Sequence, residues 1–304
     1  MFGSRAVVIR RGWFRVNRAQ NSGLAARQQR TMIKRRRLLT LMLSLSALAL
    51  PGCETTTAPG TVGTQRQQLL LISAQQLDEM AAQSYNKLKA DAAAQGKLNR
   101  DSAMLQRVRT IANRLTPQTR VFRPDAPGWR WEVNLITGNE LNAYCMPGGK
   151  IMFYTGLVQR LSLSDDEIAA VMGHEIAHAL REHSREQVSQ AIAAQAAIDV
   201  GTSLLGLGAG SADIAGMVYQ SLIATRFSRS DESEADRMGL ELMARAGYDP
   251  RAAVRLWQKM MGAGSSGGVP ELLSSHPTDS SRVQQIEALL PAVMPLYTAA
   301  RRSG

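Results

Sequence analysis

One segment constrains the fold and function of this chain more than any other. It predicts a helix that carries a pair of histidines on one face. Ser164 precedes three acidic residues, and an apolar helical pattern then runs to about His183. Ser164 and Glu167 match a capping box, and acidic residues in a first turn complement the helix dipole. The sequence therefore predicts a capped helix that carries His174-Glu175-Ile176-Ala177-His178.

The two histidines are spaced to bind one tetrahedral zinc ion. His174 and His178 are four residues apart, so both imidazoles project from one face of the helix. Glu175 is rotated by about 100° from His174, and its carboxylate can reach a water on the metal without binding the metal itself. A carboxylate so placed takes a proton from the water and passes it to the leaving amine of a peptide. The pattern predicts peptide hydrolysis; the alternative is a surface helix that contains these residues by chance.

A third protein ligand decides the class of metal site. The metzincin pattern requires a glycine and a third histidine at positions that here hold Arg181 and Ser184. His183 is one residue out of register, and we expect it to complement the dipole at the end of the helix rather than to bind the metal. The metzincin interpretation therefore fails, and a carboxylate from a later helix is the alternative.

An acidic segment further along the chain, Asp231-Glu232-Ser233-Glu234-Ala235-Asp236, offers such a carboxylate. Glu232 and Asp236 share one helix face, whereas Glu234 points to nearly the opposite side. That face supplies a ligand, and Asp236 can accept a hydrogen bond from a ligating imidazole. A solvated acidic patch is the alternative interpretation.

The start of the chain has the pattern of a targeting leader. Basic residues Lys34–Arg37 precede an apolar stretch, Leu38–Leu50, that is too short to span a bilayer comfortably. Leu50-Pro51-Gly52-Cys53 follows. This order resembles a bacterial lipoprotein signal that is cut before a lipid-modified Cys53. A short membrane anchor or an ordinary secretory signal is the alternative.

The charge distribution gives no support for nucleic-acid binding. The chain has 36 basic and 25 acidic residues, which gives a formal net charge of +11. The leader accounts for this whole excess, because eleven basic residues precede position 38 and no acidic residue precedes Glu54. We therefore expect no nucleic-acid partner, and a nucleic-acid-binding protein is a rival that rests on the leader alone.

The chain divides into four segments by composition. The leader covers residues 1–53, of which about the first 31 precede Met32, an alternative start. Residues 54–68 are rich in Thr, Gly, Pro and Gln and predict a flexible tether. Residues 69–292 form one metallopeptidase domain, and residues 293–304 form a C-terminal tail.

The predicted fold class is α+β and mainly helical, with a small antiparallel sheet beside the metal helix. Trp131–Ile136 and Lys150–Tyr154 have strand patterns, and Met146–Gly149 between them has turn residues. Residues 185–225 are rich in Ala and Gly and predict a buried helical hairpin rather than a membrane span. The other helices are expected at 73–95, 101–115, 230–246, 250–261 and 278–289.

Cysteine usage predicts no disulfide. The chain has two cysteines, and if Cys53 carries a lipid, Cys145 has no partner within the chain. We expect Cys145 to be a small packed residue rather than a nucleophile, because no histidine lies near it in the sequence.

Five stretches, which span most of residues 70–290, carry a resemblance to a known family. They are Asn142–Ile151, Thr155–Leu157, Gly173–His178, Glu232–Gly239, and His276-Pro277 with Arg282. Together they resemble the gluzincin metallopeptidases of family forty-eight, the HtpX-like group. The resemblance is closest to the periplasmic lipoprotein branch of the LoiP and BepA type, without the helical-repeat domain of BepA.

This resemblance implies one zinc ion per chain, bound by His174, His178 and Glu232. It implies that Glu175 is the general base and that Asp236 lies behind a ligating imidazole. It also implies that a protein or peptide substrate lies in extended form along one sheet-edge strand, by strand addition. The residues of that strand are Lys150, Ile151, Met152 and Phe153.

His276 has three interpretations. It donates a hydrogen bond to the oxyanion of the tetrahedral intermediate, or it is a fourth zinc ligand that displaces the water and keeps the enzyme latent. The third interpretation is a loop histidine that caps a helix before Pro277. Arg282 is expected to pair with an acid near the site, to contact substrate, or to lie on the surface.

These features predict a zinc-dependent endopeptidase that acts on unfolded or misassembled cell-envelope proteins. The leader predicts a bacterial envelope location on the periplasmic face, with a lipid anchor on Cys53. Because Glu54 rather than Asp follows that cysteine, we expect the outer membrane. The alternative function is a latent protease that acts mainly as a holdase or assembly chaperone. The sequence predicts no oligomeric state.

Overall fold

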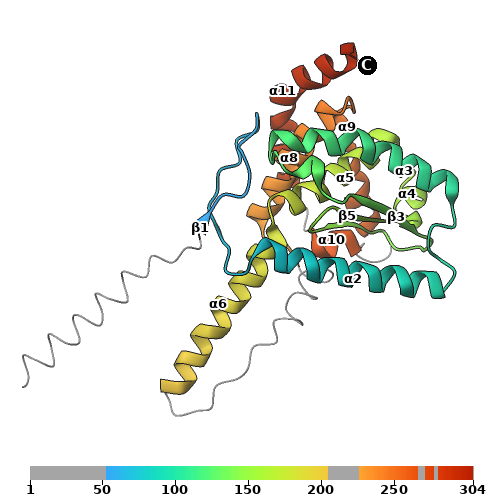
Figure 1. Cartoon of the computed structure of the whole chain (residues 1–304). Coiled ribbons are helices and arrows are strands. Elements are labelled where there is room, and N and C mark those ends of the chain that lie inside the picture. Colours follow the sequence, from blue (N-terminus) through green and yellow to red (C-terminus); the bar gives the residue numbers. More distant parts are fainter. Residues whose placement is uncertain (1–52, 205–225, 266–270, 277–279, 304) are drawn as a thin grey trace, which may run out of the picture. The chain divides into compact units, whose positions relative to one another are not determined.

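The computed structural model describes residues 53–204, 226–265, 271–276 and 280–303. The described part is mainly helical, with one three-stranded sheet and a short two-stranded ribbon, which confirms the α+β class (Figure 1). Apart from Cys53, the leader expected over residues 1–53 lies outside the described residues. Among those described, no helix combines the length and apolar character needed to cross a membrane.

The helix that carries the histidine pair is α5 (Asp165–Leu180), and every residue from Glu167 to Leu180 is buried. The predicted capping box is confirmed: the Ser164 hydroxyl accepts the Glu167 backbone N–H, and the Glu167 carboxylate accepts the Ser164 N–H. The helix ends three residues before His183, because Glu182 adopts a φ of 54°, which a right-handed helix does not accommodate. A second helix, α6 (His183–Leu204), begins at the next residue.

Three helices and one strand make the most extensive packing contacts with α5. They are α3 (Ser102–Leu115), α8 (Arg229–Arg245), α9 (Arg251–Ser265) and β4 (Ala143–Met146). Ile176 of α5, Met238 of α8 and Leu256 of α9 are almost fully buried in one apolar core. This core fixes α5 and α8 relative to each other, and these two helices supply most of the candidate ligands.

The three-stranded sheet is mixed, so the prediction of an antiparallel sheet is wrong. The strands β3 (Glu132–Ile136), β4 and β5 (Lys150–Tyr154) lie in the order β3-β5-β4, with β3 parallel to β5 and β4 antiparallel to it. The turn at Gly148 and Gly149, both with positive φ, joins β4 to β5. The hairpin places β4 along one side of β5. β3 therefore pairs with the other side of β5, and these two strands are parallel.

This strand order also corrects the expected substrate edge. Lys150, Ile151, Met152 and Phe153 belong to β5, whose two sides are occupied by β3 and β4. A strand with both neighbours in place has no free row of backbone groups for an added chain. The strand at the edge of the sheet that packs against α5 is β4.

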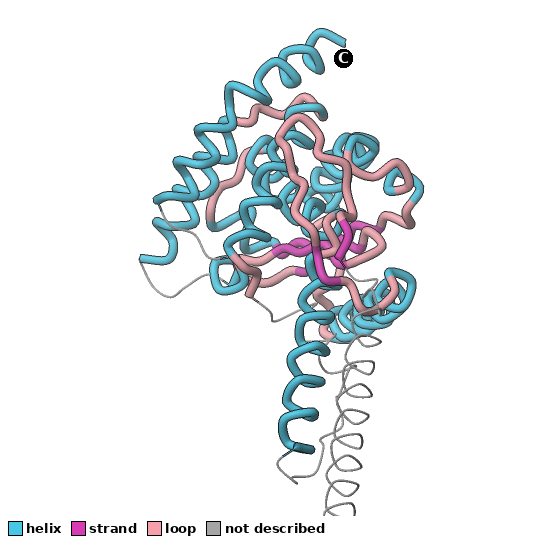
Figure 2. Tube along the Cα trace, turned by 90° about the vertical axis from the view of Figure 1, so that its left-hand side faces the viewer, coloured by secondary structure: helices cyan, strands magenta, loops and turns pink. Residues whose placement is uncertain are grey.

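The helix α2 (Ala74–Ala94) covers the face of the sheet away from α5. Its residues Leu77 and Tyr85 form a second apolar cluster with Met146 and Met152, whereas Ile151 of β5 faces the main core. The Tyr85 hydroxyl donates to the Ile151 carbonyl at 2.5 Å. Figure 2 draws all strands in magenta, and the three-stranded sheet lies among the cyan helices.

Two further expectations about the helices are corrected. The predicted tail, residues 293–304, is helical to Ser303, because α11 (Ser280–Ser303) continues through Pro291 and buries Val293. The predicted hairpin is not buried over residues 191–199 of α6, where Ile198 is 57% exposed. The rest of that hairpin, residues 205–225, lies outside the described residues. The remaining short elements are η1 (Thr116–Val121), η2 (Ala126–Gly128), α4 (Thr155–Arg160) and α10 (Glu271–Ser275).

The segment of residues 53–71, called the strap below, contains the predicted flexible tether but is packed against the domain. Its ends pair as an antiparallel ribbon of β1 (Cys53–Glu54) and β2 (Gln68–Leu69). The backbone N–H groups of Thr61 and Val62 donate to the Glu241 carboxylate of α8, and Val62 is buried. Residues 54–68 therefore form a seated part of the domain rather than a free linker.

Candidate metal centre

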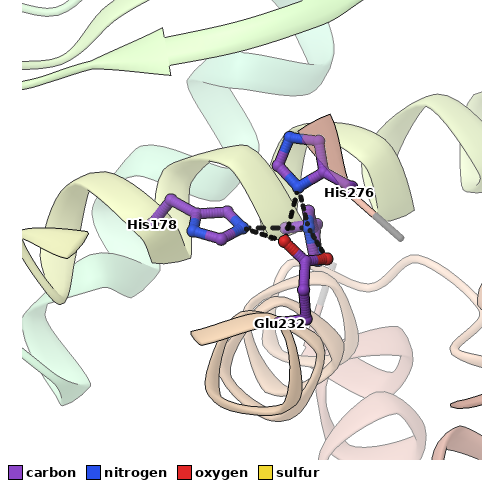
Figure 3. A group of neighbouring side chains, drawn as sticks. His178, Glu232 and His276 are labelled. Carbon is purple, nitrogen blue, oxygen red and sulfur yellow. Dashed lines mark hydrogen bonds and ion pairs between the residues drawn. The ribbon is translucent and has the colours of Figure 1, made fainter. Parts of the chain in front are cut away.

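Four buried side chains converge at the crossing of α5 and α8. They are His174 and His178 from α5, Glu232 from α8, and His276, which directly follows α10. Each offers one ligand atom, and these atoms all lie within 4.8 Å of one another. Figure 3 shows His178, Glu232 and His276 pointing toward a common centre from three different segments of the chain.

The separations within this cluster fit a shared zinc ion. Ligand atoms that surround zinc tetrahedrally at about 2.1 Å lie about 3.4 Å from one another. His174 Nε2 lies 3.1 Å from His178 Nε2 and 3.4 Å from Glu232 Oε2, and His178 Nε2 lies 3.5 Å from Glu232 Oε1. Two facing imidazole nitrogens and a carboxylate are a donor set typical of zinc. The residues present therefore fit the metal.

Glu175 lies beside the ligands without joining them. Its Oε1 atom is buried and has no hydrogen-bond partner within the described structure, and it lies 3.5 Å from His276 Nε2. Burial raises the pKa of Glu175. A buried carboxylate with an unused oxygen and a raised pKa suits the transfer of a proton beside a metal.

Asp236 lies behind His174, on the side away from the cluster. Its Oδ1 atom lies 3.0 Å from His174 Nδ1, and Arg282 donates to both of its oxygens, at 2.6 and 2.8 Å. Burial alone would raise the pKa of Asp236, but the charge of Arg282 outweighs it and lowers that pKa. Asp236 therefore stays ionised and keeps the His174 hydrogen on Nδ1, so that Nε2 faces the cluster.

Arg282 is a buried cation at the edge of the site. Its guanidinium lies 3.8 Å above the ring of Trp257, and Nη1 lies 2.6 Å from Glu232 Oε2. Its side chain is 8% exposed, which excludes the surface interpretation. The expected pairing with acids is observed, and contact with substrate stays a prediction. Burial lowers the pKa of His174, but hydrogen bonds to Asp236 and Glu232 outweigh burial and raise it to about 9.

The imidazole ring of His276 lies beside the candidate ligand atoms. Its Nδ1 atom lies 2.8 Å from Glu232 Oε1 and 3.2 Å from His174 Nε2. The imidazole is buried and faces the ligands, so the interpretation as a loop cap is wrong. Both functional interpretations, a fourth ligand and an oxyanion donor, are compatible with this position.

Three further residues, His183, Glu234 and Arg181, lie behind the metal centre, where the sequence did not place them. His183 Nδ1 lies 2.8 Å from His178 Nδ1, and His183 Nε2 lies 3.1 Å from Glu234 Oε2. Arg181 donates to Glu234 at 3.0 Å. We expected His183 to complement a helix dipole, but the turn at Glu182 directs it against the back of His178. Glu234 does lie on the side opposite Asp236, but that side is buried.

Cys145 has the packed position expected from the sequence. It lies in β4, and it is 8% exposed. Burial raises the pKa of its thiol well above the usual value. A neutral buried thiol is a poor nucleophile, so Cys145 is a packing residue.

A helix-borne histidine pair with an adjacent glutamate, completed by a carboxylate from a second helix, defines a zinc metallopeptidase of the gluzincin class. The sequence model of peptidase family M48 matches residues 102–290. This match covers more than half of the chain, and the protein belongs to that family, whose metal is zinc.

Curated relatives include two named groups of proteases. Mitochondrial metalloendopeptidase OMA1 of Schizosaccharomyces pombe is 35% identical over 167 residues, which is 53% of this chain and 47% of that protein. Metalloendopeptidase OMA1 of Bos taurus is 33% identical over 187 residues, 56% of this chain and 35% of that protein. The beta-barrel assembly-enhancing protease of Escherichia coli is 31% identical over 158 residues, 49% of this chain and 32% of that protein. The chain thus spans half or less of the length of these relatives.

Proposed function

We propose that this protein is a zinc-dependent endopeptidase that cleaves unfolded or misassembled cell-envelope proteins. The observation that carries the proposal is the position of Glu175, whose unused buried oxygen lies beside four converging ligand side chains. The names of the relatives, which include an endopeptidase and a protease that enhances β-barrel assembly, support the substrate class.

Each residue of the site has a distinct task in this proposal. His174, His178 and Glu232 hold zinc, which when bound acts as a Lewis acid toward a carbonyl oxygen and a water molecule. Glu175 takes a proton from the attacking water and delivers it to the leaving amine. Asp236 keeps the ring of His174 in the orientation and tautomer that the metal requires.

The substrate is proposed to lie along β4 (Ala143–Met146), in place of the strand first expected. This edge strand packs against α5, so an extended chain added to it passes beside the metal ligands. Beyond the turn at Pro147 and Gly148 lies a cavity of about 730 Å³, whose lining includes Asp78 and Trp129. This cavity offers room for substrate residues that continue past the end of the strand.

His276 is proposed to hold the enzyme in a resting state. Its Nδ1 atom is already at ligand spacing from Glu232 and His174, at 2.8 and 3.2 Å. A fourth protein ligand would occupy the position that hydrolysis needs open. This observation also favours the second candidate function, a latent protease that mainly holds unfolded envelope proteins.

The proposed location is the periplasmic face of a bacterial outer membrane, with a lipid on Cys53. The leader pattern supports it, as do the bacterial relatives; the OMA1 relatives are named as mitochondrial. Since the strap seats the chain from Cys53 onward, a lipid there would hold the domain close to the membrane surface.

Unfolded casein separates the two candidate functions. The zinc-loaded protein and its Glu175→Gln variant are incubated with casein, and cleavage and suppression of aggregation are both measured. Cleavage by the parent alone supports the peptidase. Absence of cleavage in both, with aggregation suppressed by both, supports the chaperone.

A further inference from the structure

A second buried cluster lies next to the metal centre. His183, Asp231 and Glu234 each offer a ligand atom, and these atoms lie within 4.8 Å of one another. Such a group could hold a metal ion, but protein cations already fill it. Arg66 Nη2 lies 2.7 Å from Asp231 Oδ1 and 3.1 Å from Glu234 Oε2, and Arg181 donates to Glu234 at 3.0 Å. The positive charge that balances the two carboxylates of this cluster comes from these two arginines.

The cluster is joined to the metal centre through the back of His178. A His178 ring that binds zinc through Nε2 carries its hydrogen on Nδ1 and donates it to His183 Nδ1, 2.8 Å away. His183 then carries its hydrogen on Nε2 and donates it to Glu234 Oε2 at 3.1 Å. This series of hydrogen bonds from His178 through His183 to Glu234 is called the relay below. Every donor and acceptor in the relay has a partner only with this set of tautomers.

Arg66, which holds the far end of the relay, comes from the strap. Its two Nη atoms donate to the two oxygens of Glu186 at 2.5 and 2.9 Å, in a bidentate pair. The same guanidinium therefore lies among three carboxylates, those of Glu186, Asp231 and Glu234. Without it, Arg181 alone would remain beside these buried acids, and their mutual repulsion would move Glu234 away from His183.

Further contacts seat the strap at this place. Gln68 donates to the Arg181 carbonyl at 2.7 Å and to Glu186 at 2.8 Å. Arg181 in turn donates to the hydroxyls of Thr55 and Thr57, at 3.1 and 3.2 Å, and to the Arg66 carbonyl at 2.9 Å. Arg181 is fully buried. The strap and the relay thus share one continuous hydrogen-bond network.

We propose that the strap is a positioning element of the metal centre: Arg66 holds Glu234 against His183 and thereby fixes the ring of His178 for zinc. The inference rests on zinc binding by His178, as in the proposed function. Arg66 touches neither metal nor substrate, and it acts through the relay. It follows that lifting the strap from the domain lowers zinc affinity, although the strap supplies no ligand.

Zinc affinity of the full chain, measured by competition with a chelator, tests this proposal without any substrate. Arg66→Met should weaken zinc binding by about 10- to 100-fold, the range found when partners behind a ligating histidine are removed. Arg66→Lys keeps the charge but loses the bidentate geometry. Its zinc affinity should therefore lie between those of the parent and of Arg66→Met. Two exposed residues give matched controls: Gln67→Ala in the strap and Arg100→Ala for loss of a positive charge should both bind zinc like the parent.

A double-mutant cycle shows whether the effect passes through the relay. In a His183→Phe background, Arg66→Met should cause little further loss of zinc affinity, since the connection to His178 is already broken. Nitrogen-15 NMR of the zinc-loaded parent should show the His178 hydrogen on Nδ1, with an altered signal in Arg66→Met. A merely structural role would lower the free energy of unfolding of the zinc-free protein and leave zinc affinity unchanged.

The outcomes separate this proposal from the proposed function. A parent chain that binds no zinc would overturn both. A parent that binds zinc, with Arg66→Met or, if that variant does not fold, Arg66→Lys binding it equally well, would overturn the role of the strap alone. Additive losses from Arg66→Met and His183→Phe would also contradict it.

Discussion

Gly239 of α8 lies against the backbone of His174 in α5 so closely that a side chain has no room there. A Cβ atom at position 239 would lie 2.7 Å from the His174 nitrogen, and a Cβ atom at Gly173 would lie 2.8 Å from the Gly239 carbonyl oxygen. The two helices therefore cross in direct backbone contact. This close crossing is what brings Glu232 and Asp236 of α8 within reach of the histidines.

Gly239→Ala should therefore disturb the metal centre from a position that carries no ligand. The added methyl group must push α8 away from α5, because its nearest neighbours are backbone atoms. We expect a loss of about 1–3 kcal/mol in the free energy of unfolding, together with weaker zinc binding. Gly128→Ala in η2 is the control, since among the described residues no atom beyond its chain neighbours lies within 4 Å of its added Cβ. Unchanged zinc affinity in Gly239→Ala would show that the ligand geometry does not depend on the crossing.

Asp236→Asn should weaken zinc binding while leaving all ligands in place. An amide in this position loses the charge that holds the His174 hydrogen on Nδ1 and that pairs with Arg282. Removal of such a partner weakens metal binding by about 10- to 100-fold. Chelator competition measures the change, with the exposed Asp91→Asn as control. Equal affinities of Asp236→Asn and the parent would remove the assigned role of Asp236.

His276→Ala distinguishes the two roles left for that residue. If His276 is a resting ligand, the variant binds zinc more weakly and cleaves casein faster. If it stabilises the oxyanion, zinc affinity is unchanged and kcat falls by about 10²–10³-fold. The resting position favours the first result. Unchanged kinetics together with unchanged zinc affinity would eliminate both roles.

The charge of the Glu234 carboxylate should make the free energy of unfolding of the zinc-free protein depend on pH. Burial raises its pKa, but the hydrogen bond from His183 and the charge of Arg181 outweigh burial and lower it to about 2. A depressed folded-state pKa contributes stability above the unfolded-state value of about 4.3. That contribution is lost as the pH falls from about 5 toward about 2.

The measurement is chemical unfolding of the parent and of Glu234→Gln across this pH window. The variant should be less stable near pH 7, and the difference in the free energy of unfolding should shrink as the pH falls. A difference that stays constant down to pH 2 would show that the Glu234 charge does not stabilise the fold.

The elements that carry the chemistry could be predicted because their signals are local. Ser164 and Glu167 define the start of α5, and the four-residue spacing of His174 and His178 fixes their common face whatever surrounds them. The same spacing places Glu232 and Asp236 together on α8. What periodicity could not supply is the crossing of the two helices, which depends on Gly173 and Gly239 being in contact.

The parts that were wrong depend on contacts between distant segments. The composition of residues 54–68 is that of a loop. Its position on the domain depends on contacts with distant elements, among them the ion pairs of Arg66 with α6 and α8 and the hydrogen bonds to Glu241. The four residues of β4 are too few to show an alternating pattern, so the position of β5 inside the sheet was not visible. The place of His183 depends on a single left-handed residue, Glu182, that no local rule predicts.

The most direct test of the central claim is the rate of casein cleavage by the zinc-loaded Glu175→Gln variant. The variant should bind zinc as the parent does and cleave about 10²–10⁴-fold more slowly, which is the usual contribution of a general base. Equal cleavage by variant and parent, or parent cleavage that persists after zinc is removed, would contradict that claim.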